Sequence, residues 1–409
     1  MASAFHSDPA EPFAGPVVQV TLKGGLGNRM MQFMAGWRLA SLVPGCRLGN
    51  ASLPEWGIDL PPIPPGPAPV HRLRDSSAPG GHLLDLAGLA AAMNDGRIRW
   101  LELDHYGQNI RNFPSRDVAA ALFRGTVAPI AAFGRETLLI NIRGDEILAA
   151  PHPHYTLVPV AFYQELVAQT GLQPVFLGQL DPGPYTQALR SAFPDARFIP
   201  SQGAMADFAT LRAARNLVVA VSTFSWLAAW LSEAEQVHLP LTGFLNPAQA
   251  QETDLLPLDD PRYRFTLFPI NYAVPVAEFE SAHRALAGTW RRMHPAMIEE
   301  LMRRRPRFPL GAHRMRAAFD EAFYLARYPD VRESVGAGGY ASGRDHYLME
   351  GYAEGREAFA LDRAWYCRAY PLAAIEVGQG DFANLHEHYV AVGRDRGYVP
   401  LPPESTGVP

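Results

Sequence analysis

The sequence predicts an α/β protein with a parallel sheet, followed by a small all-α repeat region, and three observations support this prediction. A short apolar strand, a glycine-rich turn and a helix follow one another in residues 17–41. From residue 137 onward, apolar strands alternate with helices. After residue 314, one sequence unit occurs twice. Alternating strands and helices imply a parallel sheet covered on both faces, which binds ligands at the carboxyl ends of its strands.

The composition is that of a globular chain long enough for roughly two or three domains. Of its 409 residues 48% are hydrophobic, and the net charge of −5 argues against nucleic acid as the main partner. Cys46 and Cys367 are too few and too far apart for a disulfide framework or a metal cluster, which favours a reducing, cytoplasmic compartment. The N-terminus has no apolar run typical of a signal peptide, and the apolar stretch 217–231 is shorter than the ~20 residues of a membrane span. We therefore expect a soluble protein without a transmembrane segment.

The glycine-rich turn near the N-terminus has the form of an anion site. Residues 17–22 are apolar and largely β-branched, 24–27 contain three glycines, and apolar residues then follow at helical spacing over 30–40. Glycines let the backbone approach a ligand, and free N–H groups at the start of a helix favour negative charge. The pattern lacks the spacing of a dinucleotide or ATP loop. The alternative is a tight turn whose glycines only let the helix pack on the sheet, but the long polar side chains of Asn28 and Arg29 favour a ligand.

The rest of the first half is less regular, and the second half alternates clearly. Residues 54–81 are rich in proline and glycine, which predicts surface loops, and a helix (84–93) and a strand (98–103) follow. The strands expected after these are 138–142, 174–177, 197–199, 217–221 and 237–239, and the helices between them are 162–169, 185–193, 208–214 and 225–231.

Three loops should meet at the carboxyl edges of these sheets, namely 24–29, 141–146 and 222–225. Arg143 offers a permanent charge and a planar fork of donors that suits phosphate oxygens. The hydroxyls of Ser222 and Ser225 lie at a helix N-terminus, where they either cap the helix or bind phosphate and ribose. Taken singly, Arg143 could also be an ion-pair partner. Three such loops in βα order favour a binding site.

Two of these loops resemble motifs of a known family. Residues 24–33, Gly-Gly-Leu-Gly-Asn-Arg-Met-Met-Gln-Phe, are similar to the Gly-Gly-Leu-Gly-Asn-Gln-Met-Phe-Gln-Tyr opening of the α-1,2-fucosyltransferases. Residues 222–231, Ser-Thr-Phe-Ser-Trp-Leu-Ala-Ala-Trp-Leu, are similar to their Ser-Ser-Phe-Ser-Trp-Trp-Ala-Ala-Trp-Leu segment. Residues 141–145 resemble the His-x-Arg-Arg-Gly-Asp of the family, and Asp207 precedes the last motif as in the wider α-1,2/α-1,6/O-fucosyltransferase group. The resemblance covers about residues 17–275.

The resemblance implies a GT-B-type architecture of two Rossmann-like lobes and an inverting transfer of fucose from GDP-fucose without a metal or other cofactor. Arg143 would hold the diphosphate and support the leaving GDP. The residues that the resemblance places at the donor are Gly24, Gly25, Gly27, Asn28, Arg29, Asn141, Asp207, Ser222, Thr223, Phe224 and Ser225. The chain departs from the pattern where Asn141 replaces His, where one of the two arginines is missing and where Arg29 replaces Gln. Another GDP-sugar as donor is one alternative, and a glycan- or protein-binding module with a vestigial transferase domain is another.

An inverting transfer needs a group that accepts the proton of the acceptor hydroxyl. The candidates near the donor loops are Asp145, Glu146 and His154. Asp145 follows Arg143 by two residues and leaves the same strand end, so it is the first choice. The alternative is that Asp145 only braces Arg143 or caps the following turn. His154 lies in a Pro-His-Pro-His stretch, which is typical of an exposed loop.

The expected parts of the chain are a flexible tail (1–16), an N-terminal lobe on the acceptor side (17–136), a nucleotide-sugar-binding lobe (137–275), a helical linker (276–314), two helical repeats (315–400) and a tail (401–409). The helical stretch of the linker, 277–304, ends in a basic run, 303–307, which is typical of a solvated helix end, with contact to a membrane surface or an acidic partner as the alternative. At this boundary we expect few contacts between the repeats and the lobes.

The repeats are related by a constant offset of 42 residues (366 − 324 and 388 − 346). They resemble short repeats attached to bacterial surface-polysaccharide and secreted proteins, which implies a bacterial source and an accessory role in binding protein or glycan. We expect the acceptor of the transfer to be a bacterial glycan. His346 and His388 occupy matching places in the two units. Without a cysteine or acidic cluster at ligand spacing, buried or capping histidines are favoured over a metal site.

Overall fold

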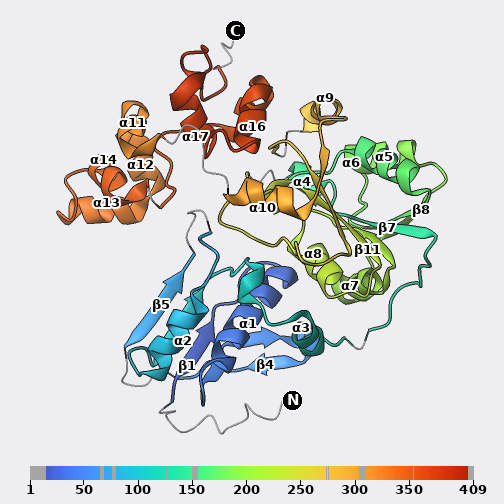
Figure 1. Cartoon of the computed structure of the whole chain (residues 1–409), viewed down its shortest axis with the longest axis horizontal. Coiled ribbons are helices and arrows are strands. Elements are labelled where there is room, and N and C mark those ends of the chain that lie inside the picture. The colour runs from blue at the N-terminus through green and yellow to red at the C-terminus, as the bar shows by residue number, and fades with distance from the viewer. Residues whose placement is uncertain are drawn as a thin grey trace.

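A computed structural model of the chain describes residues 15–403, apart from 65–68, 76–79, 126, 150–154, 273, 275, 304–309 and 353. Two α/β lobes are followed by two small helical units (Figure 1). The base candidate His154 lies outside the described residues, as do the arginines of the basic run that follow Arg303.

The first lobe contains a four-stranded, all-parallel sheet with the strand order β2-β1-β6-β5. Gly36 on α1 faces β1, where a Cβ would collide with Val20, so the helix packs directly on the central strand. A hairpin, β3-β4, lies outside this sheet. The elements of this lobe are β1 (Val17–Val20), α1 (Leu26–Ser41), β2 (Arg47–Gly49), β3 (Ala51–Leu53), η2 (Pro54–Trp56), β4 (Ile58–Leu60), β5 (Val70–Arg74), α2 (Leu86–Asn94), β6 (Trp100–Asp104), η3 (Ile110–Asn112) and α3 (Arg116–Leu122).

The expectation of loops throughout 54–81 is wrong for β4 and β5. β5 is the edge strand of its sheet, and four of its five residues are exposed. An exposed edge strand has neither a continuous apolar run nor a clean alternation, so the sequence carries little signal for it.

The second lobe contains a seven-stranded sheet with the order β13-β12-β11-β10-β7-β8-β9, parallel except for β13. Counted from β7, the six parallel strands follow the order 3-2-1-4-5-6 of dinucleotide-binding folds. Its elements are β7 (Thr137–Ile142), α4 (Glu146–Ala149), α5 (Val160–Thr170), β8 (Gln173–Gly178), α6 (Pro184–Ala192), β9 (Arg197–Pro200), α7 (Ala204–Ala213), β10 (Asn216–Val218), α8 (Thr223–Trp230), β11 (Gln236–Leu241), η4 (Gly243–Leu245), β12 (Tyr263–Leu267), η5 (Val276–Glu278), α9 (Phe279–Leu286), β13 (Arg291–Met293) and α10 (Pro295–Arg303).

Two Rossmann-like lobes that face each other form the GT-B arrangement, which confirms the predicted fold class. The segment 251–254 of the second lobe joins the lobes through backbone hydrogen bonds. Gly80 and His82 donate to Gln251 and Glu252 (2.7 and 2.9 Å), and Ile110 donates to Asp254 (2.7 Å). Aromatic contacts add to this interface, for example between Trp56 and Phe208 with ring centroids 5.3 Å apart. Most of the buried apolar side chains of both lobes therefore belong to one continuous core.

The two repeats have the same elements in the same order. After α11 (Gly311–Met315) and η6 (Arg316–Ala318), the first repeat comprises α12 (Glu321–Arg327), α13 (Pro329–Gly336), α14 (Gly343–His346) and the π-helical turn η7 (Tyr347–Gly351). The second comprises α15 (Arg363–Ala369), α16 (Pro371–Gly378), α17 (Leu385–His388) and the π-helical turn η8 (Tyr389–Gly393).

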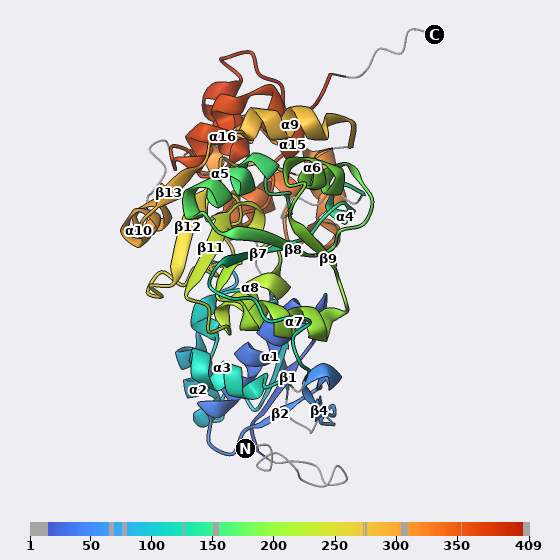
Figure 2. The same ribbon diagram turned by 90° about the vertical axis from the view of Figure 1, so that its right-hand side faces the viewer.

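The expectation of few contacts between lobes and repeats is wrong for the second repeat, which packs on the second lobe (Figure 2). Ile270 of the second lobe is buried in one cluster with Tyr366 and Ala373 of this repeat. The Gln251 side chain, in the segment that joins the lobes, donates to the backbone oxygen of Ala383 (2.6 Å). The first repeat has a core of its own and packs against the second.

A mostly apolar cavity of about 680 Å³ lies between the second lobe and the second repeat. It is lined by the chain after β12, by α9 and by α15 and α16. The predicted donor residues are absent from the described residues that line it. Within the described part of the chain, the helices are all too short or too polar to cross a membrane.

Candidate active site

The strand order of the second sheet reverses between β7 and β10, which are neighbours with Leu139 opposite Leu217. Because both strands are parallel, the loops after them leave the same edge of the sheet and then run to opposite sides. Arg143 follows β7, and Ser222 precedes α8 after β10. Open α/β sheets bind ligands in the crevice at such a reversal.

The N-termini of α1 and α8 meet at the contact between the two lobes. A Cβ on Gly27 would lie 2.5 Å from the backbone nitrogen of Phe224 and 2.7 Å from the hydroxyl oxygen of Thr223. Only glycine allows this approach, which brings together two helix ends that carry partial positive charge. No side chain among the described residues caps α1, so its first N–H groups remain available to an anion.

The other glycines of the turn differ in what they allow. Gly24 has φ of +79°, a conformation that favours glycine, and a Cβ there would lie 2.7 Å from the side-chain nitrogen of Asn28. Gly25 has an ordinary φ of −69°, and among the described residues a Cβ there would meet nothing within 4 Å. Gly24 therefore shapes the turn, Gly27 allows the two helices to touch, and Gly25 leaves open space.

The polar residues that follow the glycines are held by the first lobe. The Asn28 side-chain oxygen accepts a hydrogen bond from Gln108 (3.1 Å), and the Arg29 guanidinium pairs with Glu55 (2.9 Å). The side chains of this ion pair are 28% and 26% exposed. Asn28 and Arg29, which are both predicted to bind the donor, thus lie beside the glycine turn. Each of them already has a polar contact within the first lobe.

Arg143 is oriented by two neighbours. Its Nε donates to Glu146 (2.8 Å), and its guanidinium carbon lies 4.1 Å from the ring centroid of Tyr155. The side chain is 29% exposed. The ion-pair alternative left open by the sequence is therefore present, and the stacked ring fixes the plane of the fork.

Asp145 caps a helix in this structure. Its carboxylate oxygens accept hydrogen bonds from the backbone nitrogen of Tyr185 (3.1 Å) and from the hydroxyl of Thr186 (3.0 Å) at the start of α6. Gly183 makes this possible, because a Cβ there would collide with the carboxylate. The base role of Asp145 stays a prediction, and the cap is the alternative that its geometry favours.

The remaining predicted donor residues are engaged within the second lobe. The Asn141 side chain is buried and donates to the backbone oxygen of Leu177 (3.0 Å). Asp207 is buried and accepts hydrogen bonds from residues 201 and 202. The Ser222 hydroxyl caps α8 by accepting from Phe224 N (3.2 Å), and the buried Ser225 hydroxyl accepts from Ala220 N (3.0 Å). Asn141 thus joins β7 to β8, Asp207 fixes the loop before α7, and the two serines fix the loop before α8. The contact of these residues with a donor stays a prediction.

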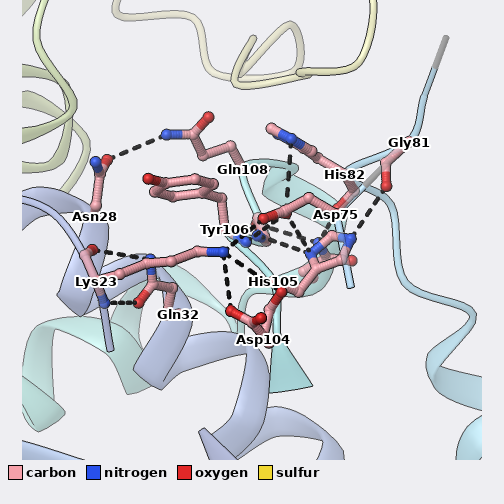
Figure 3. A network of polar contacts seen from close by, with 12 residues as sticks. Lys23, Asn28, Gln32, Asp75, Gly81, His82, Asp104, His105, Tyr106 and Gln108 are labelled. Carbon is pink, nitrogen blue, oxygen red and sulfur yellow. Dashed lines mark hydrogen bonds and ion pairs between the residues drawn. The ribbon is translucent and has the colours of Figure 1, made fainter. Parts of the chain in front are cut away.

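A polar cluster at the carboxyl edge of the first sheet was missed by the sequence reasoning (Figure 3). The Lys23 ammonium lies 2.9 Å from Asp75 and 3.0 Å from Asp104, and 4.5 Å from the centroid of the Tyr106 ring. Lys23 follows β1, Asp75 follows β5 and Asp104 ends β6. The three strands are neighbours in the order β1-β6-β5, so their ends meet. The available signal was the Asp-His-Tyr sequence after the predicted strand 98–103.

His105 braces this cluster as a neutral imidazole. Its Nδ1 accepts from Gly107 N (2.9 Å), so Nε2 carries the proton and donates to the backbone oxygen of Gly81 (3.1 Å). Burial lowers the pKa of His105, although the nearby Asp75 carboxylate opposes this. Burial also disfavours the charged form of Lys23, but its bonds to Asp75 and Asp104 outweigh it and raise the pKa of Lys23.

The carboxylates of Asp75 and Asp104 differ in the number of their contacts and in their exposure. Asp75 accepts from Tyr106 N (2.6 Å) and from Lys23, and one of its oxygens lies 3.7 Å from His82 Nε2. Asp104 meets Lys23 through one carboxylate oxygen and is 40% exposed, against 23% for Asp75. Gln108 links the glycine turn to the second lobe, because its side chain donates to Asn28 and its backbone oxygen accepts from Asp254.

Comparisons with known proteins give distant matches. Neither a protein-family model nor a curated relative matches the chain. Among solved structures, a mutant of FUT1 from Arabidopsis thaliana in complex with GDP is 16% identical, with 55% of this chain and 70% of that chain covered and a TM-score of 0.35. The iron-containing dodecameric glycosyltransferase TibC from enterotoxigenic E. coli H10407 is 15% identical, with 59% and 63% covered and a TM-score of 0.33. At this distance no residue role is carried over from either protein.

Proposed function

We propose that this protein is an inverting, metal-independent glycosyltransferase that moves a sugar, fucose in the first instance, from a GDP-sugar to a hydroxyl of a bacterial glycan. The observation that carries the proposal is the contact of Gly27 with Thr223 and Phe224. It joins the N-termini of α1 and α8 beside the strand-order reversal of the second sheet. A nucleoside diphosphate has the negative charge that two such helix ends favour.

The donor-side chemistry follows from the charge that develops on the leaving group. When the bond between the sugar carbon and the phosphate oxygen breaks, GDP leaves with the electron pair and gains negative charge. The Arg143 fork, held by Glu146 and Tyr155, would bind that charge together with the helix N–H groups. A group already oriented in this way stabilises the transition state without reorganising during the reaction.

The acceptor side is assigned to the polar cluster of the first lobe. Carboxylates, an ammonium and an aromatic ring suit a hydroxyl-rich ligand. As the acceptor oxygen attacks the sugar carbon, its proton must pass to a base. Asp104 fits this role better than Asp145, since it is 40% exposed and bonds Lys23 through one oxygen, whereas both oxygens of Asp145 cap α6.

A non-catalytic binding module is the second candidate function. The observation in its favour is that the side chains of Asn141, Asp145 and Asp207 are all hydrogen-bonded within the second lobe. Such a module would bind a GDP-sugar or a glycan without transferring the sugar.

Calorimetric titration of the full chain with GDP, UDP and NAD tests the proposal. We expect GDP alone to bind and to raise the melting temperature, because ligand that binds only the folded state stabilises it. Release of GDP from GDP-fucose, measured with and without a bacterial glycan, then separates the transferase from the binding module. Binding of GDP without any release would favour the module. The lack of GDP binding would refute the transferase and leave only a module that binds glycan or protein.

A further inference from the structure

The first repeat holds a buried histidine next to two carboxylates. His346 is 5% exposed, and its Nδ1 lies 3.0 Å from the Tyr324 hydroxyl. One ring nitrogen of His346 and one oxygen each of Glu350 and Glu354 all lie within 4.8 Å of one another. The expectation that acidic residues at ligand spacing are lacking is therefore wrong for this repeat.

The second repeat shows what its equivalent histidine does with the other ring nitrogen. His388 has the same contact to a tyrosine, with Nδ1 3.0 Å from the Tyr366 hydroxyl. Its Nε2 lies 2.9 Å from Glu376, and Glu376 is held in turn by two bonds from Arg396 (2.8 and 2.9 Å). Both ring nitrogens of His388 are thus bonded, and a cation, the Arg396 guanidinium, completes the group.

The first repeat lacks the equivalent of the His388–Glu376–Arg396 group, because its residues differ at three matching positions. Ser334 stands in the place of Glu376 (376 − 42), Glu354 in that of Arg396 (396 − 42) and Glu350 in that of Val392 (392 − 42). Among the described residues, no hydrogen bond reaches His346 Nε2. His346 therefore has the tyrosine contact of its equivalent but no carboxylate at position 334, and the carboxylates of Glu350 and Glu354 lie near it instead.

The charges around His346 favour a cation. Glu354 pairs with Arg356 (2.5 Å), which also bonds Asp330 (2.8 Å). Three carboxylates (Asp330, Glu350 and Glu354) against one guanidinium give the groups around the imidazole a net charge of −2. The contact of Glu350 with the Tyr340 hydroxyl lies at the surface and can be exchanged for another partner.

We propose that the first repeat binds one divalent transition-metal ion, Zn²⁺ in the first instance, through His346 Nε2, Glu350 and Glu354. Zn²⁺ takes imidazole nitrogen and carboxylate oxygen at about 2.0–2.2 Å and accepts water as a fourth ligand. With Nδ1 protonated, the Tyr324 hydroxyl oxygen accepts a hydrogen bond from Nδ1–H of His346 and so presents Nε2 to the metal, as partners of metal-bound histidines commonly do. In the second repeat, Glu376 and Arg396 hold the equivalent histidine without a metal.

Equilibrium dialysis of the full chain against Zn²⁺, with metal analysis and calorimetry, tests the proposal. The wild type should retain one Zn²⁺ per chain at this site. Glu350→Val and Glu354→Gln should each weaken Zn²⁺ binding by more than about tenfold. Glu350→Val is compatible with the fold, because Val392 occupies the equivalent position of the second repeat.

The matched control is Glu376→Gln in the second repeat, which should leave Zn²⁺ binding unchanged. Failure of the wild type to bind Zn²⁺ would overturn the proposal, and so would binding that survives Glu350→Val and Glu354→Gln. GDP binding should be unaffected by these variants and by EDTA. The Zn²⁺ site and the proposed transferase function are therefore tested independently.

Discussion

The carboxyl edges of the two sheets differ in how their polar side chains are engaged. At the second sheet, the buried Asn141 and Asp207 and the half-buried Asp145 satisfy backbone groups of their own lobe. At the first sheet, Lys23, Asp75 and Asp104 satisfy one another and remain partly exposed. The difference teaches that the residues in recognisable motifs mainly build the shape of the proposed donor site. The chemistry that we propose at the acceptor depends on side chains that no motif marks.

Replacing one carboxylate by an amide at the carboxyl edge of each sheet tests this comparison, and it gives the largest expected effect on turnover. Asp104→Asn should lower turnover about a thousandfold and leave GDP affinity unchanged, because it removes the proposed proton acceptor but no donor contact. Asp145→Asn should instead lower the melting temperature, because the amide nitrogen that replaces one carboxylate oxygen cannot accept a hydrogen bond from the start of α6. The expected loss is about 1 kcal/mol, with a smaller effect on turnover. The measurements are GDP release from GDP-fucose, GDP calorimetry and thermal unfolding. A thousandfold loss in Asp145→Asn with normal activity in Asp104→Asn would reverse the assignment.

Replacing Arg143 tests the one motif residue of the second edge to which we assign chemistry. Arg143→Lys should reduce turnover about a hundredfold, because a lysine keeps the charge but loses the planar fork and the stacking on Tyr155. Glu146→Gln is the control, since it removes the ion pair and keeps the guanidinium. If turnover in Arg143→Lys is near normal while Glu146→Gln unfolds more easily, Arg143 serves only as a structural ion-pair partner.

The glycines of the first turn sharpen the comparison with a smaller change. Gly27→Ala should separate the N-termini of α1 and α8, destabilise the fold by about 1–3 kcal/mol and weaken GDP binding. Gly25→Ala should leave stability unchanged, because its Cβ meets nothing within 4 Å among the described residues. Thermal unfolding and GDP calorimetry of both variants decide this. Equal stability of the two variants would show that the helix contact is not tight.

Much of the second lobe could be predicted from the sequence, because buried parallel strands such as β7 and β10 are continuous apolar runs between helices. β5 and β13 could not be predicted, since most of their side chains are exposed and their sequences show no strand pattern of their own. They are strands only because they pair with strands from other parts of the chain. The position of Arg143 after a strand was predictable for the same reason. The partners of Lys23 were not, because Asp75 and Asp104 are 52 and 81 residues away and meet it only through the strand order.

The packing of the second repeat was also beyond the sequence. Ile270 follows β12 without forming part of a regular element, and its burial depends on the arrival of α15 and α16 from a distant part of the chain. The basic run 303–307, which contains a proline, has the composition of a linker. This composition does not indicate that the second repeat, further along the chain, packs on the second lobe.

Amide hydrogen exchange of the full chain with and without GDP tests the central claim most directly, because it reports where the nucleotide binds. We expect GDP to slow exchange in residues 24–29 at the start of α1 and in 222–226 at the start of α8. Exchange in 104–108, on the acceptor side, should change little until a glycan is added. Slowed exchange confined to the acceptor-side cluster or to the repeats would contradict a donor site between the two helix N-termini.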